Sequence, residues 1–196
     1  MGSKQTATLL IAGSAPSLAE AVPVMESATN IWALNDAAFF LKDRAISFDR
    51  LFISDRRFIR DRMERLLQLD TCDIATFTQL QPEFPEALRP QLRLWESLGR
   101  RGVSLMPGRV YHGCSVFNFA FQVALQEGWQ RIQIAGVDLP PPPGYTRIDG
   151  SQHLPEYVYP YQLETTAKLL RLASDAKVEI DILSPCSNLH GLMELL

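Results

Sequence analysis

The fold is decided by Thr8-Leu9-Leu10-Ile11-Ala12-Gly13-Ser14-Ala15-Pro16-Ser17-Leu18, a short stretch near the start of the sequence. The apolar run from Thr6 to Ile11 predicts a buried strand, and Gly13 then allows the backbone a close approach. Pro16 enters a helix that we expect over Ser17 to Met25, with Ser17 able to cap it. The N–H groups at such a helix start favour an anion such as phosphate, and an ordinary strand–helix turn is the alternative.

The composition excludes several classes of protein. The chain has 196 residues, 46% of them apolar, and a net charge of −3, so any anionic ligand must be held by local groups and no nucleic-acid partner is expected. Its three cysteines, Cys72, Cys114 and Cys186, have neither the pairing of a disulfide scaffold nor the spacing of a zinc site. The sequence has no signal pattern and no membrane-length apolar run, which predicts a cytoplasmic location.

Short apolar strands alternate with helical periodicity along the remaining chain, as in α/β domains. We expect strands over Asn30–Asn35, Arg50–Ser54, Asp73–Thr78, Arg131–Asp138 and Val178–Leu183. We expect helices over Phe58–Leu69, Pro85–Leu98, Ser115–Glu127 and Tyr161–Ala173. The prediction is one Rossmann-like α/β domain over residues 4–196, with a mostly parallel sheet, helices on both faces and a short lid at about 139–160.

Polar residues follow several of these strands directly, at the edge where α/β sheets bind ligands. Asn35 is suited to hydrogen bonding with a base or sugar, and Asp36 or Asp55 to holding ribose hydroxyls or a metal. Ser54 and Asp138 occupy comparable positions after their own strands. Helix capping is the alternative for each residue, because Asn, Ser and Asp are all good caps.

Two histidines and a group of tyrosines surround the expected lid. His153 is a candidate general base, and a solvated loop histidine is the alternative. His112 precedes the helix that begins near Ser115, where it either donates to an anion or is simply exposed. Tyr145 belongs to the tyrosine group, which either clamps a sugar or phosphate or packs the loop.

A charge-rich helical face lies between residues 56 and 65. It contains Arg56, Arg57, Arg60, Asp61, Arg62 and Arg65. One interpretation is a solvated surface. The other is attraction to an anionic acceptor or peripheral contact with the inner face of the membrane.

The order of three motifs resembles the bacterial sialyltransferases of glycosyltransferase family 42. These motifs are Ile11–Leu18, Ala33–Asp36 and Leu51–Ser54, and the strand end at Ile132–Asp138 and the loop at 184–187 also match. The resemblance implies an inverting transfer of a 2-keto sugar acid, of the sialic acid or Kdo type, from a CMP-sugar to a saccharide acceptor. It further implies a metal-independent enzyme without a separate cofactor, acting in lipopolysaccharide synthesis, and we expect a homo-oligomer.

The resemblance also implies roles for individual residues. Ser14 and Ala15 stand where the family has an Asn-Gly pair beside the CMP phosphate, and Ser54 replaces an asparagine that contacts the donor. His153 corresponds to the general base, and Tyr145 to a lid tyrosine that stabilises the departing phosphate. The donor-binding set comprises Gly13, Ser14, Ala15, Ser17, Asn35, Asp36, Ser54, Ser115, Gly136, Asp138, Ser184 and Pro185.

A second resemblance leaves other functions open. The DUF115-type proteins share the Gly-x-x-Pro-Ser-Leu opening and a late Gly-x-Asp strand end, and include motility-associated glycosyltransferases and a pterin pyrophosphokinase. A magnesium-dependent pyrophosphokinase would use Asp36, Asp55 and Asp138 as carboxylate ligands. A non-catalytic module that binds a nucleotide is the third alternative.

Overall fold

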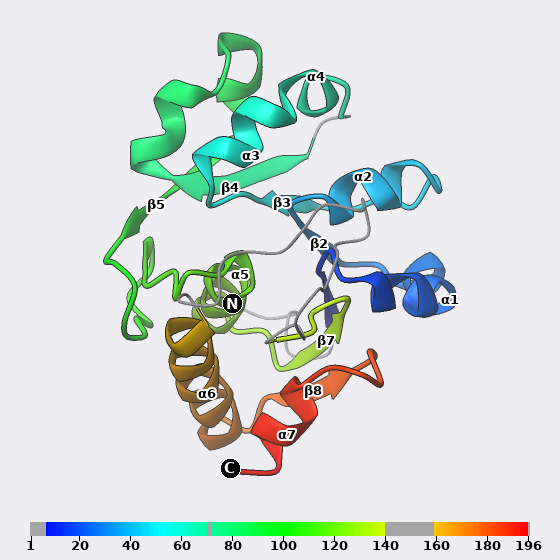
Figure 1. Ribbon diagram of the computed structural model, residues 1–196, viewed down its shortest axis with the longest axis vertical. Coiled ribbons are helices and arrows are strands. Elements are labelled where there is room, and N and C mark those ends of the chain that lie inside the picture. Colours follow the sequence, from blue (N-terminus) through cyan, green and yellow to red (C-terminus); the bar gives the residue numbers. More distant parts are fainter. Residues whose placement is uncertain (1–6, 70–71, 140–158, 196) are drawn as a thin grey trace.

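The structure, a computed structural model, describes residues 7–69, 72–139 and 159–195, and these residues form one sheet of eight parallel strands (Figure 1). The strands are β1 (Thr8–Ala12), β2 (Ile31–Leu34), β3 (Arg50–Phe52), β4 (Asp73–Phe77), β5 (Leu92–Ser97), β6 (Arg109–Val110), β7 (Arg131–Ala135) and β8 (Glu179–Ile182). Their spatial order is β6-β5-β4-β3-β2-β1-β7-β8. The predicted Rossmann-like α/β fold is therefore confirmed, and every strand pairing in the described residues is parallel.

Helices lie on both faces of this sheet (Figure 1). The α-helices are α1 (Val22–Ser27), α2 (Ala37–Lys42), α3 (Arg56–Asp61), α4 (Met63–Leu66), α5 (Val116–Gln126), α6 (Tyr159–Asp175) and α7 (Leu189–Met193). Three 3-10 helices, η1 (Pro16–Ala21), η2 (Thr78–Glu83) and η3 (Glu86–Gln91), complete the elements. Helices α1 and α2 cover one side, while α5 and α6 pack together on the other.

Aromatic side chains hold α5 on the sheet. Phe119 of α5 is buried, and its ring centroid lies 4.6 Å from Phe77, 5.1 Å from Phe52 and 5.6 Å from Trp95. Each of these three rings comes from a different strand. Burial of large rings is among the strongest stabilising contributions in a core, so this cluster fixes α5 across the middle of the sheet.

The chain changes direction across the sheet between β1 and β7. From β1 it proceeds through β2 to β6 on one side, and only then crosses over to β7 and β8 on the other. Strands β1 and β7 pair in register from Thr8–Arg131 to Ala12–Ala135. The connections leaving their carboxyl ends therefore diverge, and in such sheets ligands bind at this switch point.

Two glycines allow the backbone segments after β1 and β7 to meet. The Gly13 N–H donates to the Ala135 carbonyl at 2.7 Å, and the Ala15 N–H donates to the Gly136 carbonyl at 2.9 Å. A Cβ atom at Gly13 would lie 2.2 Å from the Gly136 oxygen, and one at Gly136 would lie 2.4 Å from the Gly13 oxygen. Any side chain at either position would force the two segments apart.

Two predicted helices are wrong in part. The segment 85–98 forms η3 followed by β5, because Pro90 removes an N–H group and Leu92–Ser97 then joins the sheet as a strand. The segment 58–69 is split into α3 and α4 at Arg62, whose φ of −115° and ψ of 11° lie outside the helical range. Short α2 and two-residue β6 were not predicted, and the expected lid lies mostly outside the described residues.

Gly136→Ala should destabilise the protein more than Gly128→Ala. Both glycines have positive φ, +64° and +79°, but a Cβ at Gly128 would meet nothing within 4 Å. The backbone strain alone costs about 1–2 kcal/mol, and the clash at Gly136 should raise the loss to about 2–5 kcal/mol. Urea unfolding followed by tryptophan fluorescence measures both values, and equal losses would show that the glycine contact does not constrain the fold.

Candidate functional site

A buried hydroxyl network joins the segments that follow β1, β7 and β8. The Ser17 and Ser184 hydroxyl oxygens lie 3.0 Å apart, and Ser17 Oγ lies 2.9 and 3.0 Å from the two carboxylate oxygens of Asp138. The Gly136 N–H donates to Ser184 Oγ at 2.8 Å. Ser17 and Ser184 are 3% and 1% exposed, so these hydrogen bonds hold the three strand ends together away from water.

The direction of donation follows from the chemistry of the groups. An ionised Asp138 can only accept hydrogen bonds, and Ser17 has a single hydroxyl proton. The Ser17 hydroxyl therefore donates to the Asp138 carboxylate, and the Ser184 hydroxyl donates to Ser17 Oγ. Burial raises the pKa of Asp138 above its ordinary value, while hydrogen bonds from Ser17 and from the Cys186 thiol partly oppose this shift. The carboxylate is only half-buried and thus remains accessible to a ligand.

The turn after β1 offers an anion fewer amide donors than the sequence suggests. The N–H groups of Gly13 and Ala15 already donate to β7 and its following residue, and Pro16 has none. Ser17 does not cap η1, since its hydroxyl bonds to Asp138 and the residue at the cap position, Ala15, has no side-chain oxygen. A phosphate at this turn would therefore depend mainly on Ser14, which is half-buried.

The start of α5 provides a second set of donors. Ser115 caps the helix, its hydroxyl accepting from the Phe117 N–H at 3.2 Å. The Cys114 N–H donates to Nδ1 of His112 at 3.0 Å, so a neutral His112 ring carries its proton on Nε2. Burial, together with the positive charge of Arg100, lowers the pKa of His112. His112 is accordingly a neutral hydrogen-bond donor at neutral pH, next to the positive end of an 11-residue helix.

Sequence reasoning missed the buried amides that fix this helix start. Gln122 accepts from the Tyr111 N–H at 3.1 Å, and Gln162 of α6 donates to the Cys114 carbonyl at 2.8 Å. Asn118 donates to the Gln162 carbonyl and accepts from Thr166 at 2.7 Å. The signal was present as polar residues at 118, 122 and 126, which recur every fourth position of an otherwise apolar helix.

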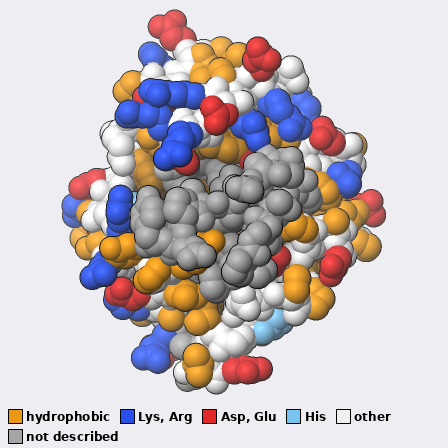
Figure 2. All heavy atoms as spheres, viewed as in Figure 1, with side chains coloured by type: hydrophobic (Ala, Val, Ile, Leu, Met, Phe, Trp, Pro, Cys, Tyr) orange, Lys and Arg blue, Asp and Glu red, His pale blue; other side chains and the backbone are white. Residues whose placement is uncertain are grey.

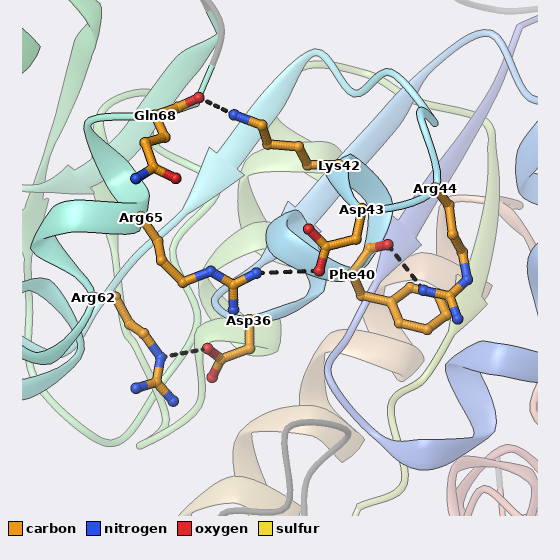
Figure 3. Close-up of polar contacts among 8 residues, drawn as sticks. All are labelled: Asp36, Phe40, Lys42, Asp43, Arg44, Arg62, Arg65 and Gln68. Carbon is orange, nitrogen blue, oxygen red and sulfur yellow. Dashed lines mark hydrogen bonds and ion pairs between the residues drawn. The ribbon is translucent and has the colours of Figure 1, made fainter.

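The polar residues after β2 and β3 fall into two groups. Asp55 caps α3 by accepting from the Arg57 N–H at 2.8 Å, and Ser54 beside it is half-buried. Asp36 is 3% exposed and pairs with Arg62, whose Nε lies 2.9 Å from Oδ1 (Figure 3). The neighbouring Asn35 adopts a left-handed backbone, with a φ of +49°. Capping therefore explains Asp55 but not Asp36.

The structure brings one part of the predicted set together by direct contact. Ala15, Ser17, Gly136, Asp138 and Ser184 are linked by the hydrogen bonds given above, and Gly13 packs against Gly136 and donates to Ala135. Ser14 lies in the same turn, whereas Pro185 is exposed in the turn after β8. Asn35, Asp36 and Ser54 share their sheet edge, and Ser115 begins α5. His153 and Tyr145 lie outside the described residues.

The basic face formed by α3 and α4 is largely paired. Arg56 and Arg60 both contact Glu83, at 2.9 and 3.0 Å, and Arg65 contacts Asp43 at 3.3 Å. Lys and Arg side chains there alternate with Asp and Glu side chains (Figure 2). Such surface pairs contribute little stability, but they reduce the positive charge available to a membrane or an acidic acceptor.

A cavity of about 350 Å³ lies at the amino edge of the sheet, opposite the carboxyl edge that carries the polar strand ends. It is lined by Lys42, Ala45, Ile46, Ser47, Phe48, Leu69 and Cys72, which lie near the amino ends of β3 and β4. The polar strand ends lie at the carboxyl edge, so this cavity is separate from them. Within residues 7–69, 72–139 and 159–195, no group of three or more His, Cys, Asp or Glu side chains is placed to hold a metal ion.

The sequence matches no family profile and no curated protein, but solved structures share its fold. The MAf glycosyltransferase from Magnetospirillum magneticum AMB-1 has a TM-score of 0.58 at 16% identity, covering 96% of this chain and 32% of that chain. The sialyltransferase CstII from Campylobacter jejuni, solved with the substrate analogue CMP-3FNeuAc, has a TM-score of 0.56 at 15% identity.

These similarities establish the fold. The alignment with CstII covers 95% of this chain and 85% of that one, whereas this chain spans about a third of the length of the MAf glycosyltransferase. Both neighbours are glycosyltransferases. Among the described residues, no helix combines the length and apolar character required to cross a membrane.

Asp138→Asn should gain stability relative to the wild type as the pH rises. A raised pKa means that the folded protein binds the Asp138 proton more tightly than the unfolded chain does. The associated stabilisation is present at acidic pH and is lost as the pH rises through the raised pKa, whereas Asn does not titrate. The free energy of unfolding, variant minus wild type, should therefore increase as the pH rises above about 4, where an unperturbed aspartate titrates; a decrease would show that hydrogen bonding to the carboxylate outweighs its burial.

Proposed function

We propose that this protein is a glycosyltransferase that binds a CMP-activated 2-keto sugar acid at the switch point between β1 and β7. The observation that carries the proposal is the convergence of Gly13, Ser17, Gly136, Asp138 and Ser184 at one sheet edge. That edge is the ligand-binding edge of this fold. Two further features support it, namely the sequence resemblance to family 42 and the shared fold with CstII, which was solved with a CMP-sugar analogue.

The leaving phosphate would be stabilised chiefly at the start of α5. A neutral His112 with its proton on Nε2 can donate to a phosphate oxygen, and the helix dipole favours negative charge nearby. Ser14 would add a contact from the β1 turn. The buried amides Gln122 and Gln162 hold the backbone on either side of His112, so these donors are pre-organised.

The proposed reaction is a single displacement at the anomeric carbon. An acceptor hydroxyl attacks this carbon and forms the new glycosidic bond, while the bond to the CMP phosphate breaks and its electron pair stays with CMP. His153 takes the proton of the attacking hydroxyl, and Tyr145 donates to the departing phosphate. These two roles rest on the family resemblance, and the reaction requires no metal ion.

The contacts of the carboxylates do not favour the pyrophosphokinase alternative. Asp36 is engaged by Arg62, and Asp55 is engaged by the start of α3. A magnesium site would have to use the remaining carboxylate oxygens, and the described residues include no group of three or more His, Cys, Asp or Glu side chains placed to hold a metal ion. A binding module without catalysis would share the nucleotide site and differ only in turnover.

Nucleotide selectivity tests the proposed function directly. In EDTA, CMP and CDP should raise the melting temperature, because the predicted phosphate contacts come from protein donors. UDP, GDP and ATP should have smaller effects. A shift seen with ATP only in the presence of magnesium would instead assign the protein to phosphotransfer.

His153→Ala should separate binding from catalysis. Loss of a general base typically lowers the rate by about 100-fold to 10,000-fold, so transfer from CMP-sialic acid or CMP-Kdo should fall by that order. CMP affinity, measured by calorimetry, should stay within about twofold. Full activity of His153→Ala would refute the base assignment.

A further inference from the structure

Asp36 lies at the start of α2, but its side chain does not cap this helix. It occupies the N-cap position of α2, yet its side chain makes no capping hydrogen bond. Asp55 and Ser115, in the same position before α3 and α5, both cap. The Asp36 carboxylate instead faces Arg62, and Figure 3 shows the ion pair between its Oδ1 and the Arg62 side chain. A structural role in capping therefore does not account for this buried acid.

Two acceptor oxygens on consecutive residues after β2 have no hydrogen-bond donor among the described residues. Asp36 Oδ2 and Asn35 Oδ1 are both buried, and neither has a hydrogen-bond partner among the described residues. Leaving a buried acceptor unsatisfied is costly, and the cost is greater for a charged group. Asn35 additionally holds a left-handed backbone. Unsatisfied groups and backbone strain that persist together at a strand end are typical of a ligand site.

The chemistry of these oxygens limits what can bind. Both are acceptors, which can receive hydrogen bonds or coordinate a cation, but the described residues include no group of three or more His, Cys, Asp or Glu side chains placed to hold a metal ion. A ligand that offers hydrogen-bond donors is therefore favoured, and the negative charge of Asp36 disfavours a phosphate oxygen there. Neighbouring hydroxyl groups meet both requirements. We propose that Asp36 and Asn35 accept hydrogen bonds from a pair of hydroxyl groups on the bound nucleotide sugar, and that Arg62 is the positioning residue for Asp36. This inference rests on the proposed function.

Arg62 is suited to this positioning role. The helix that begins as α3 breaks at Arg62 and restarts as α4, and from this break the side chain reaches the buried carboxylate. Arg62 supplies the opposite charge that a buried carboxylate requires. Arg65, one turn further on, makes a similar pair with Asp43, but at the surface, where the two side chains are 45% and 65% exposed. This second pair offers a control with the same chemistry and no buried oxygen.

The nucleotide sugar would then bind in one orientation. Its hydroxyl-bearing part would lie over the end of β2, and its phosphate would lie by His112 and the start of α5. The hydroxyl pair belongs either to the ribose or to the sugar that is transferred. These two sources share the same chemistry, and analogues of the nucleotide distinguish them.

Calorimetry with CMP, 2′-deoxy-CMP and CMP-3FNeuAc, on the wild type and on Asp36→Asn, tests the proposal. Because Arg62 Nε donates, the new amide should turn its oxygen to Arg62 and place its NH₂ group where Oδ2 was, converting an acceptor into a donor. If the ribose supplies the hydroxyls, the wild type should bind CMP about 10-fold more tightly than 2′-deoxy-CMP, and Asp36→Asn should abolish this preference. If the sugar supplies them, Asp36→Asn should weaken CMP-3FNeuAc by about 10-fold and leave CMP unchanged.

Arg62→Gln should cause part of the change in affinity that Asp36→Asn causes, whether for CMP over 2′-deoxy-CMP or for CMP-3FNeuAc. The control Arg65→Gln should bind all three ligands as the wild type does. The wild-type analogue comparison needs no variant, and Arg62→Gln supplies a second test if Asp36→Asn is unstable. Unchanged affinities for all three ligands in both Asp36→Asn and Arg62→Gln would overturn the inference, while CMP binding would still support the proposed function. A wild type that binds no cytidine nucleotide would overturn both.

Discussion

The contact between Gly13 and Gly136 is the constraint on which the rest of the structure depends. Two hydrogen bonds join the backbone just beyond β1 and β7, and no side chain fits between them. This contact brings Ser17 within hydrogen-bonding distance of Asp138 and Ser184, although Ser17 lies more than a hundred residues before either of them in the sequence. It therefore turns the diverging ends of a parallel sheet into one continuous polar surface.

Two rigid polar networks then flank this surface. The hydroxyls of Ser17 and Ser184 support the Asp138 carboxylate, and the amides of Gln122 and Gln162 support His112. The environment shifts the two titrating groups towards their neutral forms, since burial raises the pKa of Asp138 and lowers that of His112. A site with weak charge but many fixed donors and acceptors suits a nucleotide sugar, which presents hydroxyls as well as phosphate.

The sequence predicted the fold better than it predicted the roles of single residues. Strands β1, β2, β3, β4 and β7 were expected close to their observed positions because buried parallel strands are short apolar runs. Strand β8 was also expected, although it is partly exposed and alternates charged with apolar residues. Strand β5 was mistaken for helix, since Pro90 and the alternation after it were outweighed by nearby apolar spacing. Asp36 and Asp55 look alike in sequence, and only tertiary contacts show that one caps a helix and the other meets Arg62. The Asn118–Gln162 contact joins two helices far apart in sequence and left no local signal of its partner.

Hydrogen–deuterium exchange with and without CMP tests most directly the claim that the β1–β7 switch point is the donor site. Protection should appear in peptides covering residues 12–18, 34–37, 111–117 and 135–138, which meet at the carboxyl edge. The cavity around Lys42 and Phe48, at the amino edge, should show no change. Protection confined to that cavity, with none at the four strand and helix ends, would contradict the account.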